Sequence, residues 1–122
     1  MSDRLSASQI LLLVGYAAAM AAGQMLFKVA AMQDAGANSW SERISAMLVN
    51  GYFVAALILY GALTVLWVWI LTGVPISRAY PFVALAFALT PVLGILLFNE
   101  PASVRFAIGI VLVLCGLYFI AG

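Results

Sequence analysis

Hydrophobic residues fill four long stretches of the chain, and polar residues gather between them. The apolar stretches run over about Ser8–Met32, Asn50–Thr72, Pro75–Phe98 and Val104–Gly122. The hydrocarbon core of a bilayer is about 30 Å thick, so a helix needs roughly 20 mostly apolar residues to cross it. Each stretch meets that length. The pattern therefore predicts four transmembrane helices.

The connections between these stretches are short. Gln33–Val49 is rich in loop and turn residues, and we expect a loop there with Ser39 or Ser41 as a candidate N-cap. The second connection is the corner Gly73–Pro75, and the third is Asn99–Ser103. Such short connections join antiparallel neighbours. We expect an all-α integral membrane protein whose residues 1–122 form a single four-helix transmembrane domain of antiparallel hairpins.

Composition excludes a soluble protein. Of 122 residues, 67% are hydrophobic and 7% are charged, whereas soluble domains are about 45–50% apolar and about 25% charged. The net charge of +1 does not favour a nucleic-acid partner, and a chain with one Cys and no His offers no Cys/His metal site.

The first apolar stretch is longer than a signal-peptide core, so we expect it to be retained in a mature chain. Lys and Arg are nearly balanced between the two sides, which leaves the orientation unassigned.

Lys28 and Gln24 stand out within the first apolar stretch. A charged residue at the centre of a membrane helix costs roughly 2.5–3.5 kcal/mol on insertion scales, and such residues usually mark a pathway or a partner. Gln24 precedes Lys28 by one helical turn, so both polar groups project from one face. Lys28 alone could extend its amine to the membrane surface, but that does not account for Gln24. The pair is a candidate substrate-binding site.

The third apolar stretch carries a second set of candidates. Arg78 offers a planar fork of donors suited to phosphate or carboxylate, and an interfacial anchor is an equal alternative. Tyr80 follows it. Pro81, Pro91 and Gly94 predict a kinked third helix, and backbone groups freed at membrane depth are tolerated where they face protein or a wet cavity. We interpret these three residues as a kink that permits gating.

The last apolar stretch and its approach suggest packing roles. We expect the Glu100 carboxylate to lie near the N-terminus of the fourth helix in a structural role. Gly109 and Gly116 are seven residues apart on one helix face, where small residues let another helix approach closely. No acidic residue lies inside any apolar stretch, and no Ser/His/Asp set, P-loop or metal-ligand cluster is present. We therefore expect neither an enzyme nor a cofactor.

Three motifs together resemble a known family. Gly23–Lys28, Gly73–Pro81 and Asn99–Pro101 are similar, in order and spacing, to the four-helix members of the drug/metabolite transporter superfamily. Within it the chain looks closest to the aminoarabinose-phosphoundecaprenol flippase subunits of ArnE/ArnF type. The small multidrug resistance exporters share this plan and use the glycine spacing of the fourth helix at their dimer contact. Their hallmark is an embedded Glu in the first helix, where this chain has Met20.

The resemblance implies a flippase of the bacterial inner membrane that moves the head group of an undecaprenyl-phosphate-linked sugar. Lys28 and Arg78 would attract the phosphate, and Gln24 and Tyr80 would offer hydrogen bonds. Two alternatives stay open. One is an exporter of small cationic compounds, which Met20 disfavours, and the other is an accessory subunit of a lipid-modifying complex.

The resemblance also implies assembly. Two four-helix chains, identical or merely similar, would meet through Gly109 and Gly116 to form a dimer around a wider polar cavity. Neither the sugar nor the source of energy follows from the sequence.

Overall fold

The computed structural model describes residues 5–34, 36 and 38–121, and within them every element is helical. The elements are α1 (Ala7–Gln33), α2 (Trp40–Val49), α3 (Gly51–Leu71), α4 (Ile76–Ala79), the 3₁₀ helix η1 (Tyr80–Phe82), α5 (Val83–Phe98) and α6 (Val104–Ala121).

The long apolar helices match the predicted spans. Helices α1 and α3 and the continuous run Ile76–Phe98 are long and apolar enough to cross a membrane, and α6 is a shorter apolar helix. The 18 residues of α6 extend about 27 Å at 1.5 Å per residue, close to the ~30 Å of the hydrocarbon core. The all-α membrane architecture with a kinked third helix is confirmed.

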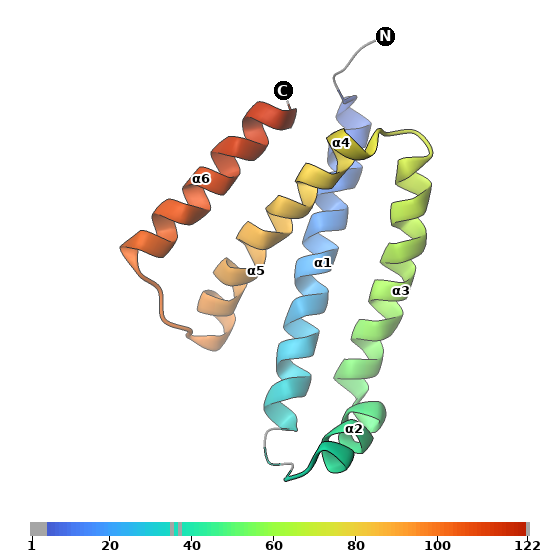
Figure 1. Ribbon diagram of the computed structural model, residues 1–122, viewed down its shortest axis with the longest axis vertical. Helices are drawn as coiled ribbons and strands as arrows, with labels where there is room; N and C mark the ends of the chain where they lie inside the picture. The colour runs from blue at the N-terminus through green and yellow to red at the C-terminus, as the bar shows by residue number, and fades with distance from the viewer. Residues whose placement is uncertain (1–4, 35, 37, 122) are drawn as a thin grey trace.

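Helix α1 forms the centre of the packing. It contacts α3 on one side and α5 on the other, and α6 packs against α5 and η1. Figure 1 shows the four long helices side by side, with both chain ends at the same end of the molecule. Ala17 and Ala21 are fully buried on α1, and such small residues let neighbouring helices approach closely. Among the α6 side chains that the structure describes, that of Leu117 alone is buried.

The connection between α1 and α3 contains α2, which we had expected to be a loop. Ser39 is its N-cap, because its Oγ accepts a hydrogen bond from the Glu42 backbone N–H at 3.2 Å. Trp40, Ile44 and Leu48 recur every four residues and are all exposed. An apolar stripe on a short helix between two spans is typical of a helix at the membrane interface.

The third span is irregular near its start. Pro75 precedes α4, and the chain then passes through η1, which contains Pro81, before it continues as α5. Proline has no N–H to donate and disfavours regular helix in the residue before it, so the span tightens into a 3₁₀ turn at Tyr80–Phe82. Pro91 lies inside α5.

The loop after α5 corrects the role expected of Glu100. Asn99 ends α5 in the left-handed conformation, with φ 52° and ψ 37°, which asparagine tolerates better than most residues. At the start of α6 the Ser103 Oγ accepts from the Phe106 N–H at 3.1 Å. Ser103 therefore caps the N-terminus of α6, and the Glu100 side chain is directed toward Lys28 of α1 instead.

Candidate functional site

An open groove of about 340 Å³ lies between α1 and α5, and we call it the α1–α5 groove. Its lining residues are Gln24, Met25, Lys28, Thr90, Pro91, Gly94, Phe98 and Glu100. Four of the residues singled out from the sequence are thus brought together from two helices. Glu100 joins them from the loop after α5.

Lys28 and Glu100 form an ion pair at this groove. The Lys28 Nζ lies 3.4 Å from Glu100 Oε2, and 46% and 43% of the two side chains are exposed. The two side chains are therefore only partly covered by the chain itself, and both charged groups are accessible to a ligand in the groove.

A chain of hydrogen bonds continues from the groove toward α3. The Gln24 Nε2 donates to the Tyr60 hydroxyl at 2.7 Å, and that hydroxyl donates to the Met20 carbonyl oxygen at 2.8 Å. Tyr60 was not singled out from the sequence, because one more aromatic residue in an apolar helix resembles the usual membrane-belt aromatics. The amide of Gln24 is thus fixed by a partner from another helix.

The groove begins at one edge of the bundle and leads inward. Phe27 contacts Phe53, the third residue of α3, with ring centroids 5.9 Å apart. Lys28 is therefore level with the start of the second span. Gln24 lies one helical turn deeper, about 6 Å further along α1, which gives the groove a charged mouth and a polar, uncharged interior end.

Two glycines make room for the polar groups. A Cβ at Gly23 would lie 2.5 Å from Tyr60 Cε2, and a Cβ at Gly94 would lie 2.5 Å from Glu100 Oε1. Real Cβ atoms do not approach other atoms this closely, so a side chain at either position would displace its neighbour. Gly94, which we had interpreted as part of a kink, holds the space in which the Glu100 carboxylate lies.

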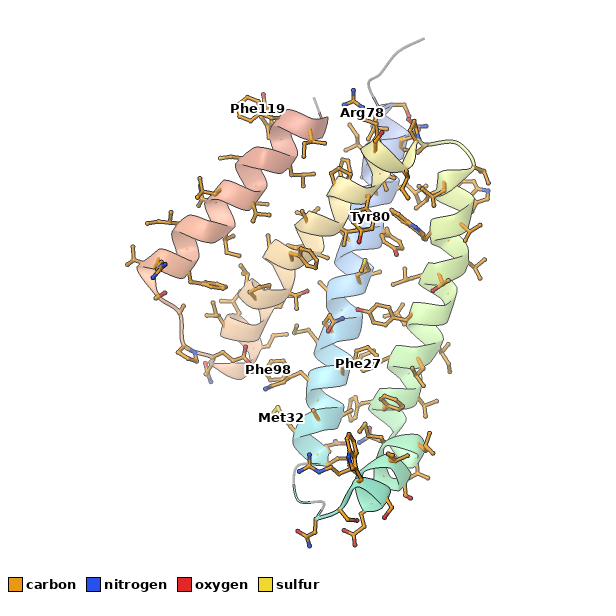
Figure 2. The ribbon with its side chains drawn as sticks, in the orientation of Figure 1. Phe27, Met32, Arg78, Tyr80, Phe98 and Phe119 are labelled. Atoms are coloured by element: carbon orange, nitrogen blue, oxygen red, sulfur yellow. The ribbon has the colours of Figure 1, made fainter. Side chains whose placement is uncertain are left out.

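Arg78 and Tyr80 lie near the opposite end of the bundle. The Gln9 Nε2 donates to the Gly73 carbonyl oxygen at 3.4 Å, so the corner before α4 lies beside the first turn of α1. Lys28 follows Gln9 by 19 residues, or about 28 Å of helix. Figure 2 shows Arg78 at the end where α1 begins, Tyr80 deeper in the bundle and Phe27 further toward the other end. Lys28 and Arg78 therefore lie at different levels of the bundle, and their roles toward a phosphate remain predictions.

Arg78 has its own partner at that end. Its Nη1 donates to the Ile120 carbonyl oxygen at 2.7 Å. A cation beside the C-terminal carbonyls of a helix is favoured by the helix dipole. The exposed Tyr80 places its ring 6.2 Å from that of Trp67. Arg78 thus ties α4 to the end of α6.

Gly109 and Gly116 face open space. Apart from the neighbouring residues and backbone of α6 itself, no atom of the described chain lies within 4 Å of a Cβ at either glycine. Their expected role against a second chain remains a prediction, and the space that it requires is present.

The hydrogen-bond chain through Tyr60 gives a stability prediction. Gly23→Ala should displace the Tyr60 ring, and such overpacking typically costs about 1–3 kcal/mol. In contrast, Gly15→Ala meets no atom within 4 Å and should stabilise the helix by up to about 1 kcal/mol. Thermal unfolding in detergent micelles should show a lower midpoint for Gly23→Ala and an equal or higher midpoint for Gly15→Ala. Matching midpoints in the two variants would show that the ring can move without cost.

Curated proteins similar to this chain are subunits of one type of transporter. A protein of Sodalis glossinidius is 33% identical over 95 residues, which cover 78% of this chain and 80% of the relative. A protein of Enterobacter sp. is 29% identical over 82% of this chain and 84% of its own length. A protein of Pseudomonas fluorescens is 30% identical over 77% of this chain and 80% of its own length. Each is named as a probable 4-amino-4-deoxy-L-arabinose-phosphoundecaprenol flippase subunit ArnE. No family model and no solved structure matches the chain.

Proposed function

Because this chain belongs to the family of ArnE-type flippase subunits, multi-pass proteins of the bacterial inner membrane, we propose that it helps to move a polyprenyl-phosphate-linked sugar across that membrane. Its relatives are transporters rather than enzymes. The substrate that we propose is the lipid in their name, undecaprenyl phosphate carrying 4-amino-4-deoxy-L-arabinose.

The α1–α5 groove is the observation that carries this proposal. It combines an accessible ammonium group with a fixed amide at the surface of an otherwise apolar bundle. A phosphate binds such groups through charge-assisted hydrogen bonds. The groove opens outward, so a polyprenyl tail can stay in the lipid while the head group lies against α1.

Arg78 and Tyr80 supply a second polar position near the other membrane surface. Because Arg78 contacts the end of α6 while Lys28 contacts Glu100 in the loop before α6, we propose that the phosphate contacts the two positions in succession rather than together. Pro81 and Pro91 are then the points at which the third span bends between these two positions.

A second chain completes the proposed assembly. The relatives are named as flippase subunits, which implies a partner subunit. We propose a dimer with an identical or similar four-helix chain through the face of α6 that bears Gly109 and Gly116. A second bundle would enclose the half-open groove and widen it for a sugar phosphate.

A translocation assay tests the proposal. Liposomes would carry the purified assembly and the aminoarabinose lipid in their outer leaflet, and an impermeant amine-reactive reagent would report how much amine stays outside. The protein should speed the loss of accessible amine toward one half of the total. A rate equal to that of protein-free liposomes would count against the flippase and favour the accessory-subunit alternative. Co-purification of a glycosyltransferase would support that alternative.

Cation export gives a separate prediction. Met20 cannot exchange protons, and no carboxylate lies within the apolar spans of the sequence. Liposomes that hold the protein and a pH gradient should therefore not accumulate ethidium above the protein-free level. Robust proton-driven accumulation would favour the exporter alternative over the flippase.

A further inference from the structure

The α1–α5 groove contains one group of each charge. Lys28 is the only cation among its lining residues, and the Glu100 carboxylate lies 3.4 Å from the ammonium. A site built for a simple anion gains nothing from a carboxylate at its mouth, because a like charge at this distance repels the ligand. The composition of the groove fits a ligand that carries both charges.

We propose that Glu100 is a specificity-determining residue, which accepts a hydrogen bond from the protonated amine of a head group whose phosphate is bound by Lys28. This inference rests on the proposed function. A zwitterionic head group would replace one Lys–Glu pair by two charge-assisted contacts, phosphate with Lys28 and ammonium with Glu100. A phosphate lipid without an amine would break the same ion pair, and its negatively charged phosphate would then lie beside the Glu100 carboxylate.

The backbone places Glu100 beside the groove. Asn99 ends α5 in the left-handed conformation, and the loop then passes Pro101 on its way to Ser103 at α6. Gly94 leaves the space that Glu100 Oε1 occupies. The site is thus built by two elements outside α1, and the amine-binding half can be changed without touching Lys28 or Gln24.

Binding of three probes to the purified protein in nanodiscs tests this role. The probes are undecaprenyl phosphate, its aminoarabinose derivative and a derivative with an uncharged pentose. The wild-type protein should prefer the amine-bearing lipid over the uncharged one by about ten-fold, or about 1.4 kcal/mol. Glu100→Gln should remove this preference. The variant should bind the amine-bearing lipid more weakly than the wild-type protein does, and it should bind the other two lipids equally well or more tightly.

Two results would overturn the proposal. If Glu100→Gln raised the affinity for all three lipids alike, Glu100 would be only a counter-ion of Lys28 that competes with the phosphate. If the affinity for all three lipids stayed unchanged, the ion pair would be a surface contact without a role in lipid selection. In both cases phosphate binding at Lys28 would persist, so the proposed function would survive. Failure of the wild-type protein to bind any of the three lipids would instead count against the proposed function itself.

Gly94→Ala offers a second variant that keeps every charge. Its Cβ would lie 2.5 Å from Glu100 Oε1 and must push the carboxylate out of place. We expect a reduced preference for the amine with affinity for undecaprenyl phosphate retained. Gly15→Ala, whose Cβ meets no atom within 4 Å, is the control and should keep the preference. A Gly94→Ala protein with the full wild-type preference would contradict a fixed position for the carboxylate.

Discussion

Replacing Lys28 by Gln should weaken the binding of undecaprenyl phosphate by roughly ten- to a hundred-fold. A hydrogen bond to a charged group contributes about 1.5–3 kcal/mol, and each 1.4 kcal/mol changes a dissociation constant about ten-fold. Gln keeps a polar end group that can still reach the membrane surface, so a residue that served only as an anchor would tolerate the change. Titration of the lipid into protein of equal folded fraction measures the effect.

Two further variants show whether affinity depends on the shape of the cation at residue 28 and on the place of the charge in the bundle. Lys28→Arg keeps the charge but brings a bulkier planar fork beside Gln24 and Glu100, so its affinity should lie between those of wild type and Lys28→Gln. Arg105→Gln removes the same charge from α6, outside the lining of the α1–α5 groove, and should match wild type. If Lys28→Gln also matched wild type, the phosphate would have to be sought at Arg78.

Replacing both Gly109 and Gly116 by Leu should convert the assembly mostly to monomer. Van der Waals packing holds membrane helices together, and small residues let their backbones approach closely enough for it. A Cβ at either glycine faces open space in the single chain, and both glycines are exposed, so the leucines add bulk on an open face of α6. Cross-linking in native membranes would give the fraction of paired chains, and the translocation assay would give the loss of transport.

The control places a leucine elsewhere on the same helix. Val111 is 56% exposed and points about 140–160° away from the glycines around the α6 axis, at 100° per residue. Val111→Leu should therefore keep the wild-type fraction of paired chains. A wild-type protein that transports lipid as a persistent monomer would reject the dimer.

The spans could be predicted from the sequence because length and apolarity decide them. A helix that lies in lipid must satisfy its own backbone, so about 20 apolar residues leave few alternatives. The 3₁₀ turn at Pro81 was predictable for a similar reason, since proline supplies no backbone N–H to a regular helix. Helix α2 escaped notice because its ten residues are too few for a span and include enough polar positions to resemble a loop.

The site was only half predictable, and the missing half depends on packing. Lys28 and Gln24 were conspicuous because a polar residue in an apolar stretch is costly. Tyr60 and Glu100 reach them from parts of the chain far away in sequence, through contacts that no local pattern encodes. The same limit applies to Arg78, because chemistry suited to phosphate could not show that its guanidinium contacts the Ile120 carbonyl oxygen.

The loop that holds Glu100 also changes the shape of the surface offered to lipid. It lies part-way along α1 rather than beyond its end (Figure 1). Helix α1 has 27 residues, or about 40 Å of helix, whereas the 18 residues of α6 cover about 27 Å. A bilayer meets such a mismatch by thinning locally, at a fraction of a kcal/mol per Å. Lipids beside α6 should therefore sit in a thinner membrane than lipids beside α3, which has 21 residues.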